Sequence, residues 1–253
     1  MRVEPLWQTA PDALTLPCGE VQVWRACLDV DAEVLERWRE TLSAEEQARA
    51  RRFHSPADRD RYTAGRGILR ALLARYLGTS AGDFRFCLNA HGKPGLAPGD
   101  GNADLRFNVS HSHGLALFAF TWGREVGVDL ELVWPTLRDD LLAERFFSAQ
   151  EVAALRALPE GAGKEAFFHC WTRKEAYIKA RGAGLSINLA SFAVSLIPDP
   201  VGHLPITGND GAEGGRWWLR ALAPGGGYVG AVAAEGEDWP LTLWQWPSPG
   251  GSM

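Results

Sequence analysis

Two acidic residues interrupt an apolar run in the middle of the chain. Asp129 and Glu131 stand two residues apart in the segment VGVDLELV, residues 126–133. In a β-strand, residues i and i+2 project from the same face, so both carboxylates leave one face of a segment that otherwise favours burial. Buried carboxylates are rarely left unpaired. We therefore expect a cation opposite them, which could be a divalent metal ion or, as for most isolated pairs of this kind, a nearby arginine.

The acidic pair ends a longer stretch, FNVSHSHGLALFAFTWGREVGVDLE, residues 107–131. We expect two strands joined by a tight turn, with a polar cluster of Asn108, Ser110 and His111 at one end and the acids at the other. His111 could contact a phosphate or donate a hydrogen bond, although a structural role is more common for a histidine considered alone. His113 would share its face if the strand continued. Ser110 and His111 do not form a hydrolase dyad, because neighbouring side chains on an extended chain point to opposite sides.

A strong helical pattern covers residues 164–181 and ends at Gly182. Trp171, Glu175 and Lys179 recur every four residues, so they lie nearly in one row. Glutamate followed by lysine at i+4 is often an ordinary surface ion pair worth roughly a few tenths of a kcal/mol. Here the row begins with a tryptophan beside residues that favour burial, so the pair could equally face a cleft.

Arginines gather between residues 49 and 66 in a chain whose net charge is −5. The acidic balance argues against nucleic acid as a partner, so any polyanion must bind to a local basic cluster. Such arginines could hold phosphate or could form a solvated face, which is the usual role of charged runs. The constrained loop HGKP, residues 91–94, could present Lys93 to a ligand, but no GxxxxGK[ST] or GxGxxG motif is present. The basic positions are Arg49, Arg51, Arg52, Arg61, Arg66 and Lys93.

Local signals mark where helices begin and end. We expect helices at about residues 31–42, from residue 43 to just before Phe53, and at residues 55–77, and a fourth from residue 148 to about 158. The signals for their starts are a capping-box spacing at Ser43–Glu46, a serine before a proline at Ser55–Pro56, and a second capping box at Ser148–Glu151.

The order of the elements predicts an α+β fold. Strand patterns at residues 21–30 and 84–88 flank the first helices, and four more follow the last helix, at residues 192–197, 216–222, 228–234 and 241–246. Each half of the chain has one long helix that ends in a glycine, Gly78 or Gly182. We expect two similar α+β halves, residues 1–106 and 107–253, that meet near residues 105–115.

The four cysteines are scattered and form no CxxC pair. A disulfide framework or a zinc site is therefore not expected, and a reducing cytoplasm fits better. The N-terminal segment lacks a basic start followed by an apolar core, and no apolar run approaches the length of a membrane span. We expect a cytoplasmic protein that makes no use of a membrane.

Four motifs follow one another in the order GKP (92–94), FNVSHS (107–112), VGVDLE (126–131) and FFHCWTRKEAYIKARGAGLSI (167–187). In this order and at this spacing they resemble the motifs of the Sfp-type 4′-phosphopantetheinyl transferases. The segment upstream, from residue 43 onward, resembles the same family, so that the similarity spans roughly residues 43–192. VGVDLE and WTRKEAYIK are the specific part of it.

The resemblance implies an enzyme that moves the 4′-phosphopantetheine arm of coenzyme A onto a serine of an apo carrier protein and releases 3′,5′-ADP. It implies a monomer of two similar α/β subdomains in a pseudo-two-fold arrangement, with coenzyme A and Mg²⁺ in the cleft between them. Residues 1–106 would then supply contacts to the phosphates and adenosine, and residues 107–253 the metal-binding and catalytic motifs. The partners would be acyl or peptidyl carrier proteins, such as those of polyketide and nonribosomal peptide biosynthesis.

The same resemblance assigns roles to residues. Asp129, Glu131 and Glu175 would bind the metal, with Glu175 also the candidate general base and Lys179 a contact to the phosphates. The catalytic residues would thus be Asp129, Glu175 and Lys179. The residues implied to bind coenzyme A are Arg49, Arg61, Arg66, Lys93, Pro94, Ser110, His111, Lys174 and Lys179.

One departure from the family pattern concerns phosphate binding. Glu46 stands where some members have a base, so binding would depend more on Arg49 and its neighbours. For the acidic carrier protein, Arg173 and Arg181 are the candidate contacts.

Two other functions remain open at this point. A non-catalytic module of the same fold could bind coenzyme A or a carrier protein, although the presence of every motif acid and of Lys179 disfavours it. An unrelated metal-dependent phosphatase or nuclease could use the acidic pair, but further Asp or His metal motifs are missing and the net charge is acidic.

Overall fold

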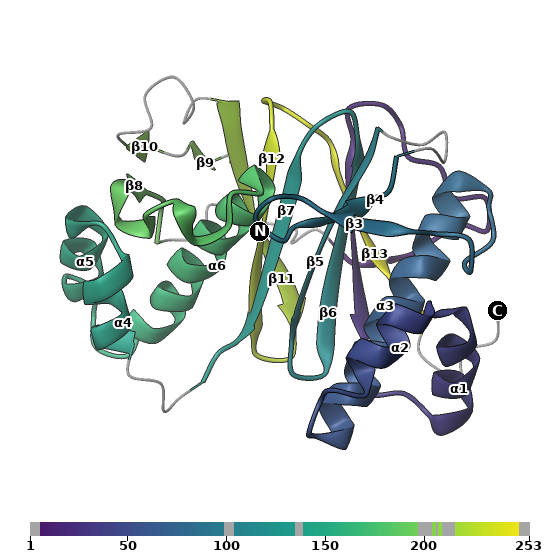
Figure 1. Ribbon diagram of the computed structural model, residues 1–253. Helices are drawn as coiled ribbons and strands as arrows, with labels where there is room; N and C mark the ends of the chain where they lie inside the picture. Colours follow the sequence, from purple (N-terminus) through teal and green to yellow (C-terminus); the bar gives the residue numbers. More distant parts are fainter. Residues whose placement is uncertain are drawn as a thin grey trace.

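Two β-sheets form the centre of the computed structural model, which describes residues 6–98, 104–134, 139–196, 204–205, 207–208 and 216–247. Helices lie on both sides of these sheets (Figure 1). The first sheet has the order β1-β13-β2-β6-β5, and the second has the order β7-β12-β11-β9. Their strands are β1 (Gln8–Thr9), β2 (Val21–Cys27), β5 (Leu105–Ser112), β6 (Leu115–Trp122), β7 (Val126–Leu132), β9 (Leu204–Pro205), β11 (Trp217–Gly225), β12 (Tyr228–Glu235) and β13 (Leu241–Gln245).

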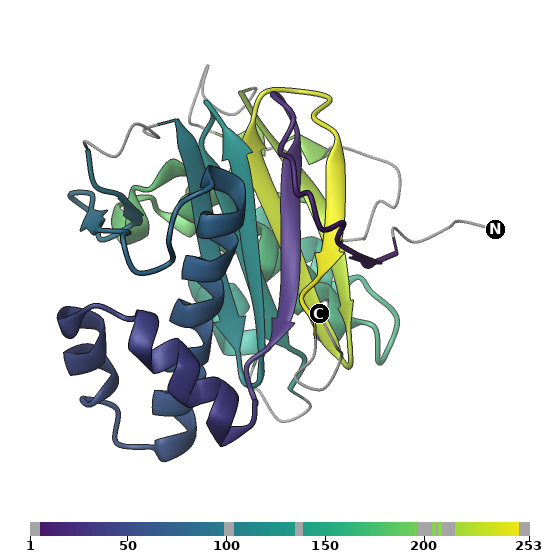
Figure 2. The ribbon, with the colours of Figure 1, turned by 90° about the vertical axis from the view of Figure 1, so that its right-hand side faces the viewer.

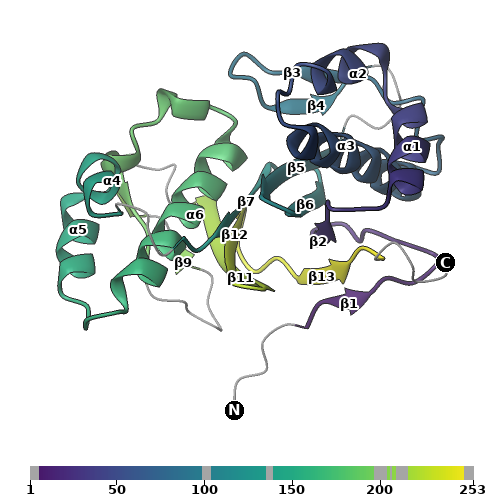
Figure 3. The ribbon, with the colours of Figure 1, turned by 90° about the horizontal axis from the view of Figure 1, so that it is seen from below.

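Three helices cover the outer face of the first sheet, as the view along the sheets shows (Figure 3). They begin where the sequence predicts. Ser43 and Glu46 form a complete capping box, Ser55 accepts a hydrogen bond from the backbone of Asp58, and Gly78 ends the third helix in the left-handed conformation. The helices are α1 (Ala32–Thr41), α2 (Ala44–Ala50) and α3 (Pro56–Leu77).

Three further helices lie on the opposite side, where the longest packs against the second sheet and the other two pack on that helix (Figure 3). The longest, α6, packs on β7 and β12 and ends at Gly182, again in the left-handed conformation. A Cβ atom on Gly127 of β7 would lie 2.2 Å from the backbone of Ala176 and Ala180, so a glycine is needed for α6 to approach the strand this closely. The helices are α4 (Asp139–Phe146), α5 (Ala149–Arg156) and α6 (Gly163–Arg181).

The inner faces of the two sheets share an apolar core. Val21 and Val23 of the first sheet meet Val126 and Val128 of the second, all fully buried. Because side chains alternate along a strand, the other face of β7 carries Gly127, Asp129 and Glu131. The alternation therefore turns both acids toward the side on which α6 packs.

The C-terminal strand connects the two sheets. β13 follows β12 of the second sheet but pairs in parallel with β2 of the first, between β2 and the short strand β1. Figure 2 shows this strand beside β2. The expected α+β architecture of two subdomains is confirmed. The expected division after residue 106 stays a prediction, and that boundary falls within β5.

Several local expectations need correction. The stretch 107–131 contains parts of three strands, not two, because a second turn at residues 123–125 separates β6 from β7. Asp31 occupies the N-cap position of α1, but its side chain makes no capping hydrogen bond. Of the strand expected at residues 192–197, the structure has Phe192–Ala193, while residue 197 lies outside the described residues.

Several short elements complete the fold. The sequence did not predict α4 or most of these short elements. Two strands form a small hairpin (Figure 1), and the second of them begins at Pro94, the last residue of the loop expected at residues 91–94. These elements are β3 (Phe86–Leu88), β4 (Pro94–Leu96), β8 (Phe192–Ala193), β10 (Thr207–Gly208) and the 3₁₀ turns η1 (Gly184–Ser186) and η2 (Leu189–Ser191).

Candidate active site

The polar cluster and the acidic pair, expected at opposite ends of one stretch, lie side by side. Ser110 on β5 donates a hydrogen bond of 2.9 Å to Asp129 Oδ1 on β7. Lys179 Nζ on α6 reaches the same oxygen at 2.6 Å and Ser110 Oγ at 3.0 Å. The third strand of the stretch lies beside the first and runs in the same direction, so that β5, β7 and α6 converge on a single carboxylate.

Asp129 is the most buried acid of this group. Its residue exposure is 2%, and its Oδ2 atom, unlike Oδ1, has no hydrogen-bond partner among the described residues. A buried carboxylate oxygen without a partner carries a substantial desolvation penalty. Asp129 therefore has one oxygen occupied by Lys179 and Ser110 and one oxygen available to a further cation.

The charge of Asp129 affects the pKa of both Glu175 and Glu131. We call these three residues the acid cluster. Burial, and then repulsion from Asp129, raise the pKa of Glu175 to about 7, although Lys179 opposes the shift. Burial and Asp129 also raise the pKa of Glu131. Lys179 alone therefore does not compensate the three carboxylates.

These acids fit a hard divalent cation in their chemistry. The described residues contain no group of three His, Cys, Asp or Glu side chains close enough together to hold a metal ion, so the expected three-acid set does not converge on one point. Mg²⁺, however, usually binds through one or two carboxylates and completes its shell with water and substrate phosphates. The available oxygen of Asp129 and the mutual repulsion of the acids match that mode of binding.

A pH dependence of stability follows from Glu175. Its folded-state pKa of about 7 lies above the ordinary value of 4.5, so the folded state holds this proton more tightly than the unfolded state. The contribution of Glu175 to the free energy of unfolding is therefore fully present below about pH 4.5, and it is lost as the pH rises toward about 7. We expect Glu175→Gln to raise the melting temperature relative to the unmodified chain at pH 8 and to change it much less at pH 4.5, measured by calorimetry without divalent cations. An equal effect at both pH values would contradict this account.

His111 lies on β5 next to the acid cluster but points to the exposed side of the strand. Desolvation of its ring, and then the charge of Lys179, lower its pKa. His113 does not share its face, because β5 ends at Ser112 and His113 adopts a φ of 53° in the following turn. Its ring packs on Trp134 with a centroid distance of 4.6 Å.

The GKP loop faces the C-terminal half of α6 across a cavity of about 280 Å³. His91, Lys93 and Pro94 line one side of it, and Glu175 and Lys179 line the other. The cavity therefore leads from the loop to the acid cluster.

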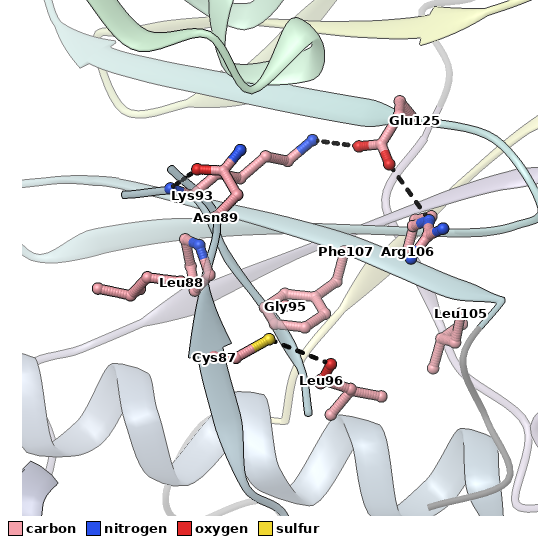
Figure 4. A pocket seen from close by; sticks show the side chains of 11 residues that line it. Cys87, Leu88, Asn89, Lys93, Gly95, Leu96, Leu105, Arg106, Phe107 and Glu125 are labelled. Atoms are coloured by element: carbon pink, nitrogen blue, oxygen red, sulfur yellow. Dashed lines mark hydrogen bonds and ion pairs between the residues drawn. The ribbon is translucent and has the colours of Figure 1, made fainter. Parts of the chain in front are cut away.

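The side chain of Lys93 is committed to the protein itself. Its Nζ donates to Glu125 Oε2 at 2.6 Å, to the Ala180 carbonyl at 2.9 Å and to the Val126 carbonyl at 3.1 Å, which uses all three hydrogens of an ammonium group. Figure 4 shows a second pocket, beside the β3–β4 hairpin. At this pocket Glu125 forms ion pairs with both Lys93 and Arg106. Lys93 thus fixes the loop to α6 and β7, which differs from the expected role as a direct coenzyme A contact.

The three arginines implied to bind phosphate lie on α2 and α3. Arg61 forms a double hydrogen bond with Asp29, and Arg66 pairs with the buried Glu46 at 2.9 Å. Arg49 lies over the ring of Tyr62 and lines a surface depression with Arg52. In the part of the chain that the structure describes, none of these arginines contacts the acid cluster.

Two residues of the WTRKEAYIK motif point away from the cleft. Lys174 is fully buried, pairs with Glu151 at 2.8 Å and donates to the carbonyls of Leu189 and Phe192. These three contacts commit its ammonium group to the protein itself, which differs from the expected contact with coenzyme A. Arg173 is also fully buried, which rules it out as a surface contact for a carrier protein.

Trp171 does not continue the row of Glu175 and Lys179. Its ring packs on Phe146 and Phe167 in the core beneath α4. Eight residues of an α-helix advance by about 80° beyond whole turns, so the row from Trp171 to Lys179 winds from this core into the cleft. Of the two alternatives that the sequence left open, Glu175 and Lys179 line the cavity, and the expected single row of three residues does not include Trp171.

Ser112 and Glu125 have roles in this region that were not predicted from the sequence. Ser112 contacts Glu131, and Glu125 holds Lys93. The alternation of polar residues at 108, 110 and 112 was the available signal for Ser112.

Comparison with known proteins agrees with this arrangement. A family model described as the 4′-phosphopantetheinyl transferase superfamily matches residues 125–233, and one for the N-terminal region of 4′-phosphopantetheinyl transferase matches residues 30–121. The chain is 40% identical over 240 residues to the 4′-phosphopantetheinyl transferase HetI of Nostoc sp., covering 95% of this chain and 98% of that protein. It is 32% identical to the 4′-phosphopantetheinyl transferase Sfp of Bacillus subtilis, covering 81% and 87%.

The chain therefore belongs to the 4′-phosphopantetheinyl transferase family and is a transferase. The matches include β7 with its acidic pair and all of α6, the two elements that carry Asp129, Glu131, Glu175 and Lys179.

Proposed function

We propose that this protein transfers the 4′-phosphopantetheine group of coenzyme A to a serine hydroxyl of an apo acyl or peptidyl carrier protein. The observation that carries the proposal is the meeting of Asp129, Lys179 and Ser110 between β5, β7 and α6, beside Glu175, in a chain of this family. Family membership supplies the reaction, and the cluster supplies the groups that the reaction needs.

In this reaction the serine oxygen forms a bond to the phosphorus that carries the pantetheine arm. The bond from that phosphorus to the bridging oxygen of the pyrophosphate breaks, and 3′,5′-ADP leaves with the bonding electrons. The serine proton must pass to a base. Glu175 is our candidate, directly or through one water molecule, because its raised pKa of about 7 suits proton exchange near neutral pH.

Charge on the phosphoryl oxygens must be neutralised during the transfer. Lys179 is the cation of α6 that faces the cavity, and it can exchange its pairing with Asp129 for a phosphate oxygen. His111 lies at the neighbouring edge of β5 and can donate a hydrogen bond to a phosphate.

Asp129 and Glu131 would hold Mg²⁺, with Asp129 Oδ2 as the available buried oxygen, while Glu175 lies beside them as the candidate base. When bound, the ion would neutralise charge on the pyrophosphate and make 3′,5′-ADP a better leaving group. Coenzyme A would extend from this cluster toward the GKP loop, with Arg49 and its neighbours as the candidates for its outer phosphate.

We further propose that the protein acts as a cytoplasmic monomer on carrier proteins. The described helices include none with the length and apolar character that a membrane crossing requires. The exposed Cys18, Cys27 and Cys87 are all free thiols, which is in keeping with a reducing compartment.

The test is incubation of the purified protein with coenzyme A, Mg²⁺ and a panel of apo carrier proteins. We expect a carrier mass increase equal to one phosphopantetheinyl group, located on a serine, with release of 3′,5′-ADP. If a known enzyme modified the same panel and this protein modified none, the proposal would fail. Binding of coenzyme A by calorimetry without modification of any carrier would instead indicate a non-catalytic module.

A further inference from the structure

The two sheets meet along a line at which no backbone pairing joins them. β5 and β7 are edge strands of their own sheets, and in the described structure β5 pairs with β6 while β7 pairs with β12. An edge strand leaves alternate N–H and C=O groups without partners. Burial at this junction therefore requires other partners for the edge of β7.

Side chains of β5 supply those partners. Asn108 Oδ1 accepts the N–H of Val128 at 2.9 Å, and Ser112 Oγ accepts the N–H of Leu132 at 3.2 Å. Both contacts span 20 residues of sequence, so β5 and β7 run in the same direction along this line. We call Asn108, Ser110 and Ser112 the side-chain seam.

One member of the seam also contacts an acid of the site. Ser112 Oγ donates to Glu131 Oε2 at 3.0 Å while it accepts from the Leu132 backbone. His113 Nδ1 lies 3.3 Å from the same hydroxyl, but the carboxylate is the nearer and the more strongly attracting acceptor. Ser112 is 7% exposed, so water competes little for this hydrogen bond.

The Ser112 hydroxyl therefore holds the β7 backbone in position and also orients the side chain of Glu131. It also lowers the cost of charge on Glu131, whose pKa is raised by burial and by Asp129. A carboxylate that is oriented in this way by a neighbour is the usual arrangement around bound metal ions.

We propose that Ser112 is a positioning residue that holds Glu131 in the orientation needed to bind the divalent cation. The inference rests on the proposed function of the cleft and assigns Ser112 a task separate from contact with coenzyme A. Loss of a neighbour that orients a metal ligand typically lowers metal affinity by about 10- to 100-fold.

The test measures metal binding without turnover. Mn²⁺ is titrated by electron paramagnetic resonance into the full-length protein with saturating coenzyme A and no carrier protein. We expect Ser112→Ala to weaken Mn²⁺ binding by about tenfold or more, and Ser112→Thr, which keeps the hydroxyl on a β-branched side chain suited to a strand, to stay within about threefold of the unmodified chain. Ser191→Ala, at a half-buried serine whose hydroxyl donates to the Asn188 carbonyl, is the matched control and should not change binding.

Equal Mn²⁺ affinity in Ser112→Ala and the unmodified chain would overturn the inference. So would an equal loss in Ser112→Thr, because the hydroxyl would then not be the cause. If Ser112→Ala failed to fold, Ser112→Cys would serve in its place, since a thiol keeps the shape and is a much weaker donor. Failure of the unmodified chain to bind Mn²⁺ or to transfer the arm would defeat the proposed function itself, which is a different result.

Discussion

Replacing Asp129 with asparagine is expected to lower the rate of phosphopantetheine transfer by roughly a thousandfold or more. Asparagine keeps the shape of the side chain but carries no charge. It therefore removes the ion pair with Lys179 and the negatively charged Oδ2 that is available to a cation. Metal-assisted charge neutralisation is worth several kcal/mol, and about 1.4 kcal/mol corresponds to a factor of ten in rate. The measurement is the initial rate of holo-carrier formation at saturating coenzyme A, by mass spectrometry.

Two comparisons make this result specific. Circular dichroism should show that the variant remains folded, because Ser110 and Lys179 can both still hydrogen-bond to the amide oxygen. Asp31→Asn is the matched control, since Asp31 is exposed at the start of α1 and makes no capping hydrogen bond. Activity of Asp129→Asn within about tenfold of the unmodified chain would remove Asp129 from the catalytic centre.

Gly127→Ala is expected to lower both stability and activity sharply. The added Cβ would lie 2.2 Å from the Ala176 carbonyl oxygen and the Ala180 nitrogen, and neither backbone atom can move unless α6 moves. Overpacking of a core typically costs about 1–3 kcal/mol, and a clash with backbone belongs at the upper end of that range.

The same shift would disturb the site. α6 carries Glu175 and Lys179, and β7 carries Asp129, so a change in their separation misplaces all three groups together. A displacement of about 1 Å can lower a rate by roughly a hundredfold. We expect that loss in the transfer rate at temperatures where the variant is still folded.

Gly163→Ala provides the control on the same helix. A Cβ atom added to Gly163 would meet no atom within 4 Å beyond its own neighbours in the chain and the nearby backbone of α6, and alanine favours a helix over glycine by up to about 1 kcal/mol. The substitution should leave activity unchanged and raise the melting temperature slightly. If Gly127→Ala matched this control in denaturant unfolding and in activity, the close approach of α6 and β7 would not be what positions the site.

Local sequence signals predicted much of this fold. The capping boxes at Ser43 and Ser148, the Ser55–Pro56 start and the glycines that end α3 and α6 act within one turn of the backbone. They were therefore readable without knowledge of tertiary contacts. The strict alternation around Asp129 likewise predicted that both acids would share a face.

Features set by long-range contacts were not predictable in the same way. Nothing local distinguishes Lys174, which is buried against Glu151, from Lys179, which reaches Asp129 in the cleft. The ammonium group of Lys93 donates hydrogen bonds to Glu125, which is more than 30 residues away in sequence, and to the carbonyl of Ala180, which is more than 80 residues away. The motif resemblance gave the order of these residues but not the direction of each side chain.

The position of the site is tested most directly by a crystal structure of the protein with coenzyme A and Mg²⁺ in the absence of a carrier protein. We predict the pyrophosphate between Lys179 and the edge of β5, with the cation bound to Asp129 and Glu131. A pyrophosphate bound on the surface of Arg49 and Arg52, with Lys179 still paired to Asp129, would contradict this prediction.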